Sequence, residues 1–134
     1  MENLIIKGTA TTPFVSCDVS KRVITIKGRA ISENAFEFFS PVEEWILEYK
    51  KLKHPLQVDF YFEYFNTSSS IYMRKIIKEL DEMHICGANV VLNWQYDDDD
   101  EDMLDHGMEI TYKISFPINF IPISSGDTHP SIDA

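Results

Sequence analysis

The segment Leu56–Phe65 constrains the fold more than any other part of this chain. Its large apolar residues recur at every second position: Val58, Phe60, Phe62 and Tyr64. This spacing is the period of a β-strand with one buried face. Short polar residues follow at 66–70, and a helical apolar pattern then continues to about Cys86. A strand that leads directly into a long helix is the building unit of an α/β sheet protein.

The rest of the chain extends this alternation of strands and helices. Strands are predicted at 4–7, 14–17, 22–27, 56–65, 89–96 and 116–123, with helices at 34–53 and from about 70 to 86. Residues 101–115 fit both a strand and a helix period. We therefore predict one α/β domain over residues 1–123, with a mixed, mostly parallel sheet, helices packed on it and right-handed crossovers. A polar tail is expected at 124–134.

The first helix carries a start signal inside it. Ser40 and Pro41 are typical of an N-cap and a first helical position, so Phe36 and Phe39 are assigned to a separate short turn. The expected apolar face consists of Val42, Trp45, Ile46, Tyr49 and Leu52. We expect Trp45 and Trp94 to be buried. Both cysteines, Cys17 and Cys86, lie in apolar stretches and are expected to be buried and reduced.

Composition excludes several classes of partner. The 134 residues carry a net charge of −10, which argues against binding to nucleic acid or to an anionic membrane surface. No stretch approaches the roughly 18 apolar residues of a membrane span. The first residues lack the pattern of a signal peptide, so the expected compartment is the cytoplasm.

The polar run at 66–70 is the candidate functional site, and it consists of Asn66, Thr67, Ser68, Ser69 and Ser70. One of these residues is needed to cap the following helix. The surplus of hydroxyl groups at a helix N-terminus, where a phosphoryl group is tolerated, indicates a phosphorylation site as one interpretation.

An enzyme is the alternative interpretation of the same hydroxyl run. A Thr or Ser nucleophile needs a base, and His84 lies roughly 20 Å or more along the helix. Nothing marks His54 or His106 as a base. The glycines are scattered and form no phosphate-binding loop, so no cofactor is predicted.

The acidic run at 97–102 does not have the alternating ligands or the glycine position of a calcium loop. We interpret it as a solvated loop that leads into a helix N-terminus, with partner docking as the open alternative. No metal site is predicted.

Motifs along the whole chain resemble the SiaC-type bacterial regulatory phosphoproteins. The resemblance runs from the first residues to about Ile123 and is densest at 64–69, where the sequence reads Tyr-Phe-Asn-Thr-Ser-Ser. It also includes residues 1–4, 8–9, 12–13, 26–29, 33–34, Trp45, 93–94, 96–97 and 116–117. The residues that follow the serine run, Ile71 and Tyr72, depart from the family pattern, as do the four aspartates.

The resemblance implies a STAS-like fold, a helix over about 99–112 and a switch that is not an enzyme. It implies that Thr67 is phosphorylated by a Ser/Thr kinase of the histidine-kinase-like ATPase fold and dephosphorylated by a PP2C-type phosphatase. The unphosphorylated form is expected to bind and activate a GGDEF diguanylate cyclase, and so to promote cyclic-di-GMP synthesis and biofilm growth. A partner-switching protein acting on transcription, like an anti-sigma-factor antagonist, is the alternative within the binding class.

The expected partner-binding surface is the region around the phosphorylation site. Ser68 is the fallback acceptor if the kinase tolerates a shift of one residue. The residues assigned to this surface are Asn66, Thr67, Ser68, Ser69, Ser70 and Tyr72.

Overall fold

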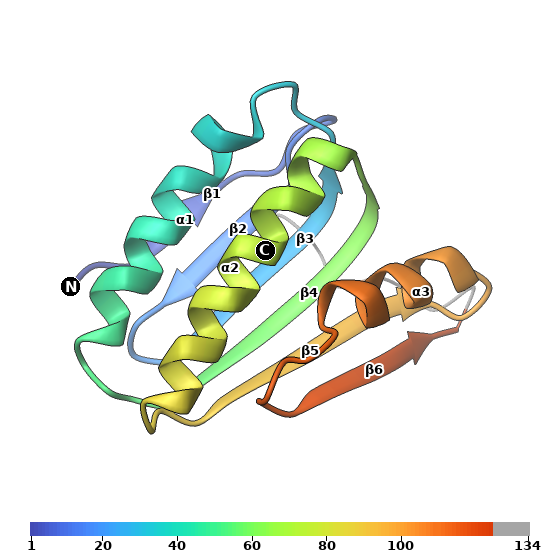
Figure 1. The fold of residues 1–134 in the computed structure, drawn as a ribbon. Coiled ribbons are helices and arrows are strands. Elements are labelled where there is room, and N and C mark those ends of the chain that lie inside the picture. The colour runs from blue at the N-terminus through green and yellow to red at the C-terminus, as the bar shows by residue number, and fades with distance from the viewer. Residues whose placement is uncertain (125–134) are drawn as a thin grey trace.

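A computed structural model describes residues 1–124 and contains six strands and three helices (Figure 1). In chain order the elements are β1 (Leu4–Ile6), β2 (Phe14–Asp18), β3 (Val23–Ala30), α1 (Ala35–Lys50), β4 (Leu56–Phe65), α2 (Thr67–Ile85), β5 (Val90–Asp97), α3 (Glu101–Ile110) and β6 (Ile118–Ile123). The predicted order is confirmed, and the ambiguous segment after the acidic run is helical. Of the tail predicted at 124–134, all but Ser124 lies outside the described residues.

The strands form one mixed sheet in the order β1-β2-β3-β4-β5-β6. The first two pairings are antiparallel and the last three are parallel, which confirms the predicted mixed α/β fold. Each parallel connection places the new strand on the same side of the previous one. Right-handed crossovers therefore put α1, α2 and α3 on one face of the sheet, as Figure 1 shows.

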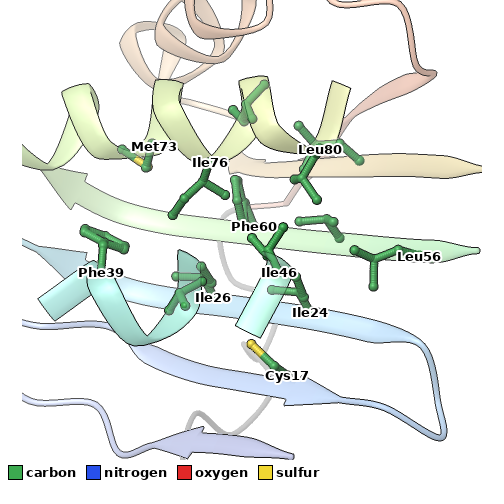
Figure 2. Packing of buried hydrophobic residues seen from close by; sticks show 14 of the residues in the cluster. Cys17, Ile24, Ile26, Phe39, Ile46, Leu56, Phe60, Met73, Ile76 and Leu80 are labelled. Atoms are coloured by element: carbon green, nitrogen blue, oxygen red, sulfur yellow. The ribbon is translucent and has the colours of Figure 1, made fainter. Parts of the chain in front are cut away.

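The core lies between this helical layer and the sheet. Figure 2 shows Met73, Ile76 and Leu80 of α2 in the same buried cluster as Phe60 of β4. Trp45 and Trp94 are both buried, as predicted. The core therefore fixes α2 against β4, the two elements that meet at the candidate site.

The alternation in β4 does not continue to its end, which corrects one prediction. Gly28 of β3 pairs with Phe62, but Arg29 pairs with Tyr64, so Glu63 is an extra residue in the ladder. Such a β-bulge reverses the face to which the following side chains point. Tyr64 is therefore 57% exposed, and Phe65 takes the buried position.

The start of α1 also differs from the prediction. The helix begins after Asn34 and continues through Pro41, so Phe36 and Phe39 belong to it rather than to a separate turn. The Asn34 side chain accepts a hydrogen bond from the Glu37 amide at 3.1 Å and donates one to the Glu37 carboxylate at 3.0 Å. This reciprocal cap and the burial of Phe39 outweigh the helix hydrogen bond that proline cannot donate.

At the other end, α1 stops at Lys50, and Leu52 is exposed outside it instead of contributing to the apolar face.

The two cysteines differ in burial. Cys17 is buried, and burial raises the pKa of its thiol to about 12. Cys86 is exposed at the C-cap of α2, so its predicted burial is wrong. The last turn of α2 presents it to solvent because Met83 occupies the buried side.

Within residues 1–124, no helix is both long enough and apolar enough to cross a membrane.

Candidate functional site

The candidate site begins at Asn66, which joins β4 to α2. The Asn66 side chain accepts a hydrogen bond from the Ser69 amide at 2.9 Å, so this residue is the N-cap of α2. Its side-chain amide also donates to the Ser32 carbonyl at 3.1 Å, and its backbone amide donates to Ala30 at 3.0 Å. Asn66 therefore ties the start of α2 to the end of β3 and the loop after it.

The four hydroxyl residues after Asn66 differ in accessibility. Thr67 and Ser68 are exposed, and Ser70 is half-buried with its hydroxyl donating to the Thr67 carbonyl at 2.7 Å. Ser69 is buried, and its hydroxyl has no hydrogen-bond partner within residues 1–124. The exposed residues of the run are thus Thr67 and Ser68, at its start.

Tyr72 lies one turn further along α2 and packs against the start of α1. Its ring stacks on Phe39 with centroids 6.4 Å apart and contacts Phe36 at 5.8 Å. The Lys75 ammonium group lies 5.7 Å from the centroid of the same ring. Tyr72 is half-buried, so only part of its ring is available to another protein.

A pocket of about 370 Å³ opens beside Thr67. Its walls come from the end of β4, the first two turns of α2 and the second half of α3, and its lining includes Tyr64, Ser70, Arg74, His106 and Glu109. The Arg74 guanidinium group donates to the Glu109 carboxylate at 2.8 Å across the pocket. In the sequence, these two residues are 35 positions apart.

His106 is distant from Thr67 in the sequence, and nothing in the sequence marked it, but it lies in the wall of this pocket. Its ring contacts Phe65, with centroids 5.2 Å apart. His106 and Thr67 line the same pocket, and no hydrogen bond between them is among those of the described residues. His84, which lies on α2, accepts a hydrogen bond from the Val90 amide at 3.3 Å.

Chemically, this arrangement is an exposed residue with a hydroxyl group at a helix N-terminus, in the same pocket as an arginine that is paired with a carboxylate. It suits a hydroxyl that accepts a phosphoryl group, because the helix dipole and the arginine both favour an anion there. Arg74 was recognisable in principle, because it follows Thr67 by two helical turns and lies on nearly the same face. His106 and Glu109 were not, because their positions depend on where α3 packs.

The second half of the acidic run forms the start of α3. The Asp100 side chain accepts from the Met103 amide at 3.1 Å and caps the helix, while Glu101 and Asp102 occupy its first turn. These are the positions where negative charge stabilises a helix. Among the described residues, no group of three or more His, Cys, Asp or Glu side chains is placed so that it could hold a metal ion.

Comparisons with known proteins converge on one family. The family described as SiaC family regulatory phosphoprotein matches residues 6–123. An uncharacterized protein of Pseudomonas aeruginosa strain UCBPP-PA14 is 33% identical over 118 residues, which cover 87% of this chain and 94% of the relative.

Solved structures of SiaC from Pseudomonas aeruginosa are also similar to this chain. The apo-SiaC crystal structure superimposes with a TM-score of 0.84 at 31% identity, over 90% of this chain and 99% of that one. SiaC in complex with the diguanylate cyclase SiaD, of which it is the activator, superimposes with a TM-score of 0.87 at 31% identity and the same coverage.

Proposed function

This chain belongs to the SiaC family of regulatory phosphoproteins, and from that premise we propose that its unphosphorylated form binds and activates a diguanylate cyclase. The observation that carries the proposal is the similarity, over 90% of the chain, to a relative solved in complex with the cyclase that it activates. The chain is proposed to act as a regulator and not as an enzyme. Its output would be cyclic-di-GMP synthesis, and hence biofilm growth.

The surface around Thr67 has the character of a protein-docking site. Three large apolar side chains near the start of α2 are mostly exposed: Phe36 at 60%, Tyr64 at 57% and Ile71 at 59%. Tyr64 and Thr67 line the same pocket, Ile71 follows Thr67 by one helical turn, and Phe36 contacts Tyr72. Aromatic and apolar groups of this kind contribute most of the affinity in protein interfaces.

Phosphorylation of Thr67 is the proposed control. It would add nearly two negative charges to the docking surface of a chain whose net charge is already −10. A partner that buries this group unpaired, or sets it against like charge, loses several kcal/mol of binding energy. We therefore expect a loss of affinity of about a hundredfold, since each 1.4 kcal/mol is tenfold.

The accessible residues at the start of α2 define the proposed contact surface. They are Asn66, Thr67, Ser68, Ser70 and the exposed part of Tyr72. Ser69 was included on sequence grounds, but its burial removes it from direct contact. Exposure of Thr67 supports access by the proposed histidine-kinase-like Ser/Thr kinase and PP2C-type phosphatase in the cytoplasm, with Ser68 as the fallback acceptor.

The decisive experiment titrates the protein against a candidate diguanylate cyclase and measures both binding by calorimetry and the rate of cyclic-di-GMP formation. Unphosphorylated protein and Thr67→Ala should bind and activate, whereas the phosphorylated form should do neither. Thr67→Glu should be weakened to an intermediate extent, because it carries one charge. Ser68→Ala separates the two acceptors, and Thr25→Ala, on the sheet and away from the site, is the control.

Equal binding by all these forms would contradict the phosphorylation switch, and an absence of any effect on the cyclase would contradict the cyclase proposal. Phosphate mapping to a residue other than Thr67 or Ser68 would reject the site. If the unphosphorylated protein binds only its kinase and alters transcription, the partner-switching alternative is correct.

A further inference from the structure

The pocket beside Thr67 is lined by a cationic side chain, Arg74, which pairs with Glu109. From this geometry we infer that Arg74 is a phosphate-binding residue, which receives the phosphoryl group of phosphorylated Thr67 and releases Glu109. The inference rests on the proposed function in one respect, namely that Thr67 is the residue phosphorylated. It adds an intramolecular ligand for the phosphate, formed by the side chains that line this pocket.

The helix geometry allows Arg74 to approach the phosphoryl group. Arg74 follows Thr67 by seven residues, which is two turns with an offset of about 20° and a rise of about 10 Å. Side chains on a helix lean toward its N-terminus, so the arginine extends back toward Thr67. Ser70 lies between them on the same wall, and all three residues line the one pocket. A phosphoryl group extends from Thr67 into the remaining space.

The present partner of Arg74 is easily exchanged. The side chains of Arg74 and Glu109 are 48% and 70% exposed, and an ion pair so accessible to water contributes little stability. A phosphoryl group carries nearly twice the charge of a carboxylate and offers three acceptor oxygens, so it can take two guanidinium hydrogen bonds at once. Phosphate should therefore displace Glu109 from Arg74.

This exchange would change the link between two helices. The Arg74–Glu109 pair joins α2 to α3 across the mouth of the pocket. When Arg74 turns to the phosphate, the Glu109 carboxylate is released toward solvent. The surface offered to a partner then differs at α3 as well as at Thr67, so phosphorylation alters a wider area than the modified residue.

The test is a ³¹P NMR titration of full-length protein with phosphothreonine incorporated at position 67 during synthesis. The second pKa of the phosphate, ordinarily near 6, is lowered by a nearby cation because the cation favours the dianion. We expect Arg74→Ala to raise this pKa by about 0.5 or more, and Arg74→Lys to raise it less. Glu109→Gln removes the competing carboxylate and should lower it.

Two controls isolate the arginine. Lys75→Ala removes the adjacent cation of α2, which pairs with Glu43 at 3.4 Å and does not line the pocket, so it should leave the pKa nearly unchanged. His106 also lines the pocket, and histidine is a side chain that can gain a positive charge, so the series is repeated with His106→Gln. Circular dichroism melts verify that each variant is folded.

The inference would be overturned if the phosphate pKa were identical in the parent and in Arg74→Ala, both with His106 present and with His106→Gln. Neither kinase nor cyclase takes part in this measurement. If phosphorylation does not change binding to the cyclase, the proposed function is contradicted, but the inference that Arg74 binds the phosphate still stands. If Arg74→Ala does not change the phosphate pKa, the inference is contradicted, but the proposed function still stands.

Discussion

Gly107 of α3 lies directly against the indole of Trp94. A Cβ atom at Gly107 would be only 2.5 Å from the Trp94 Nε1 atom, closer than real Cβ atoms approach any neighbour. The same Nε1 donates a hydrogen bond to the Met103 carbonyl at 3.1 Å. The tryptophan thus holds α3 against the sheet, and the missing side chain at Gly107 is what allows the helix to come so close.

Gly107→Ala should therefore destabilise the protein, although alanine is ordinarily favoured over glycine in a helix by roughly 0.5–1 kcal/mol. Overpacking against the buried ring is expected to reverse that gain and lower the free energy of unfolding by about 1–3 kcal/mol. Urea unfolding measures this change in the free energy of unfolding. The control is Asp105→Ala, at an exposed position on the same helix. A Gly107→Ala variant more stable than the parent would show that Trp94 moves aside at no cost.

The two cysteines should react at very different rates. In the folded protein, a thiol reagent at pH 8 should modify Cys86, which is exposed, and leave Cys17 protected by burial and by its raised pKa of about 12. Mass spectrometry before and after denaturation counts the modified thiols. The variant Cys86→Ser provides the control, and it should show no rapid reaction. Rapid modification of Cys17 would mean that the core beneath α1 opens readily.

Asn66→Ala should lower stability by about 1–2 kcal/mol, because the Ser69 amide loses its cap. Asn66→Asp should cost less, since a carboxylate still caps the helix. It cannot donate to the Ser32 carbonyl, however, so part of the loss remains. Thermal melts should rank the melting temperatures as parent, then Asn66→Asp, then Asn66→Ala. Asn89→Ala, at an exposed position, is the control. An Asn66→Ala variant with the parent's melting temperature would contradict the capping role.

Asp18 should make a small contribution to stability that depends on pH. The Asp18 carboxylate accepts a hydrogen bond from the Lys21 amide at 2.8 Å, which lowers the pKa of this carboxyl below its ordinary value of 3.8. A hydrogen bond from the Ser20 hydroxyl adds to the effect. Because the folded pKa lies below the unfolded one, the contribution is present above about pH 4 and is lost as the pH falls through the folded value.

Melting temperatures of the parent and of Asp18→Ala should therefore differ at pH 7, and the difference should shrink as the pH is lowered below about 4. Asp18→Asn, which keeps an acceptor but does not titrate, is the matched control. A gap between parent and Asp18→Ala that widens on acidification would contradict the stated sign.

The junction between β4 and α2 was predictable because local chemistry determines it. Alternating apolar residues define the strand, and Asn66 and the hydroxyl residues after it are the residues that cap a helix. The pocket was not predictable to the same degree. Its far wall comes from His106 and Glu109, whose place depends on α3 packing through Gly107 onto Trp94, a contact between residues distant in the sequence.

The errors at Pro41 and Tyr64 have related causes. Ser40 and Pro41 satisfy the local preference for a helix start, but the cap at Asn34 and the burial of Phe39 extend the helix further back. At Tyr64, the bulge at Glu63 is a property of the pairing with β3, and the sequence of β4 alone carries no sign of it. In both places tertiary contacts outweigh a local preference.

The agreement between strand order and chain order has a consequence for biosynthesis. Each strand of the sheet pairs with the strand made just before it, so the sheet can grow outward from one edge while the chain leaves the ribosome. Until β5 is complete, β4 is the outer strand: one edge of its backbone pairs with β3, and the edge that will pair with β5 is open beside the aromatic side chains Phe60 and Phe62. A nascent chain that has just released β4 is therefore the form most exposed to aggregation, and pairing with β5 ends that exposure.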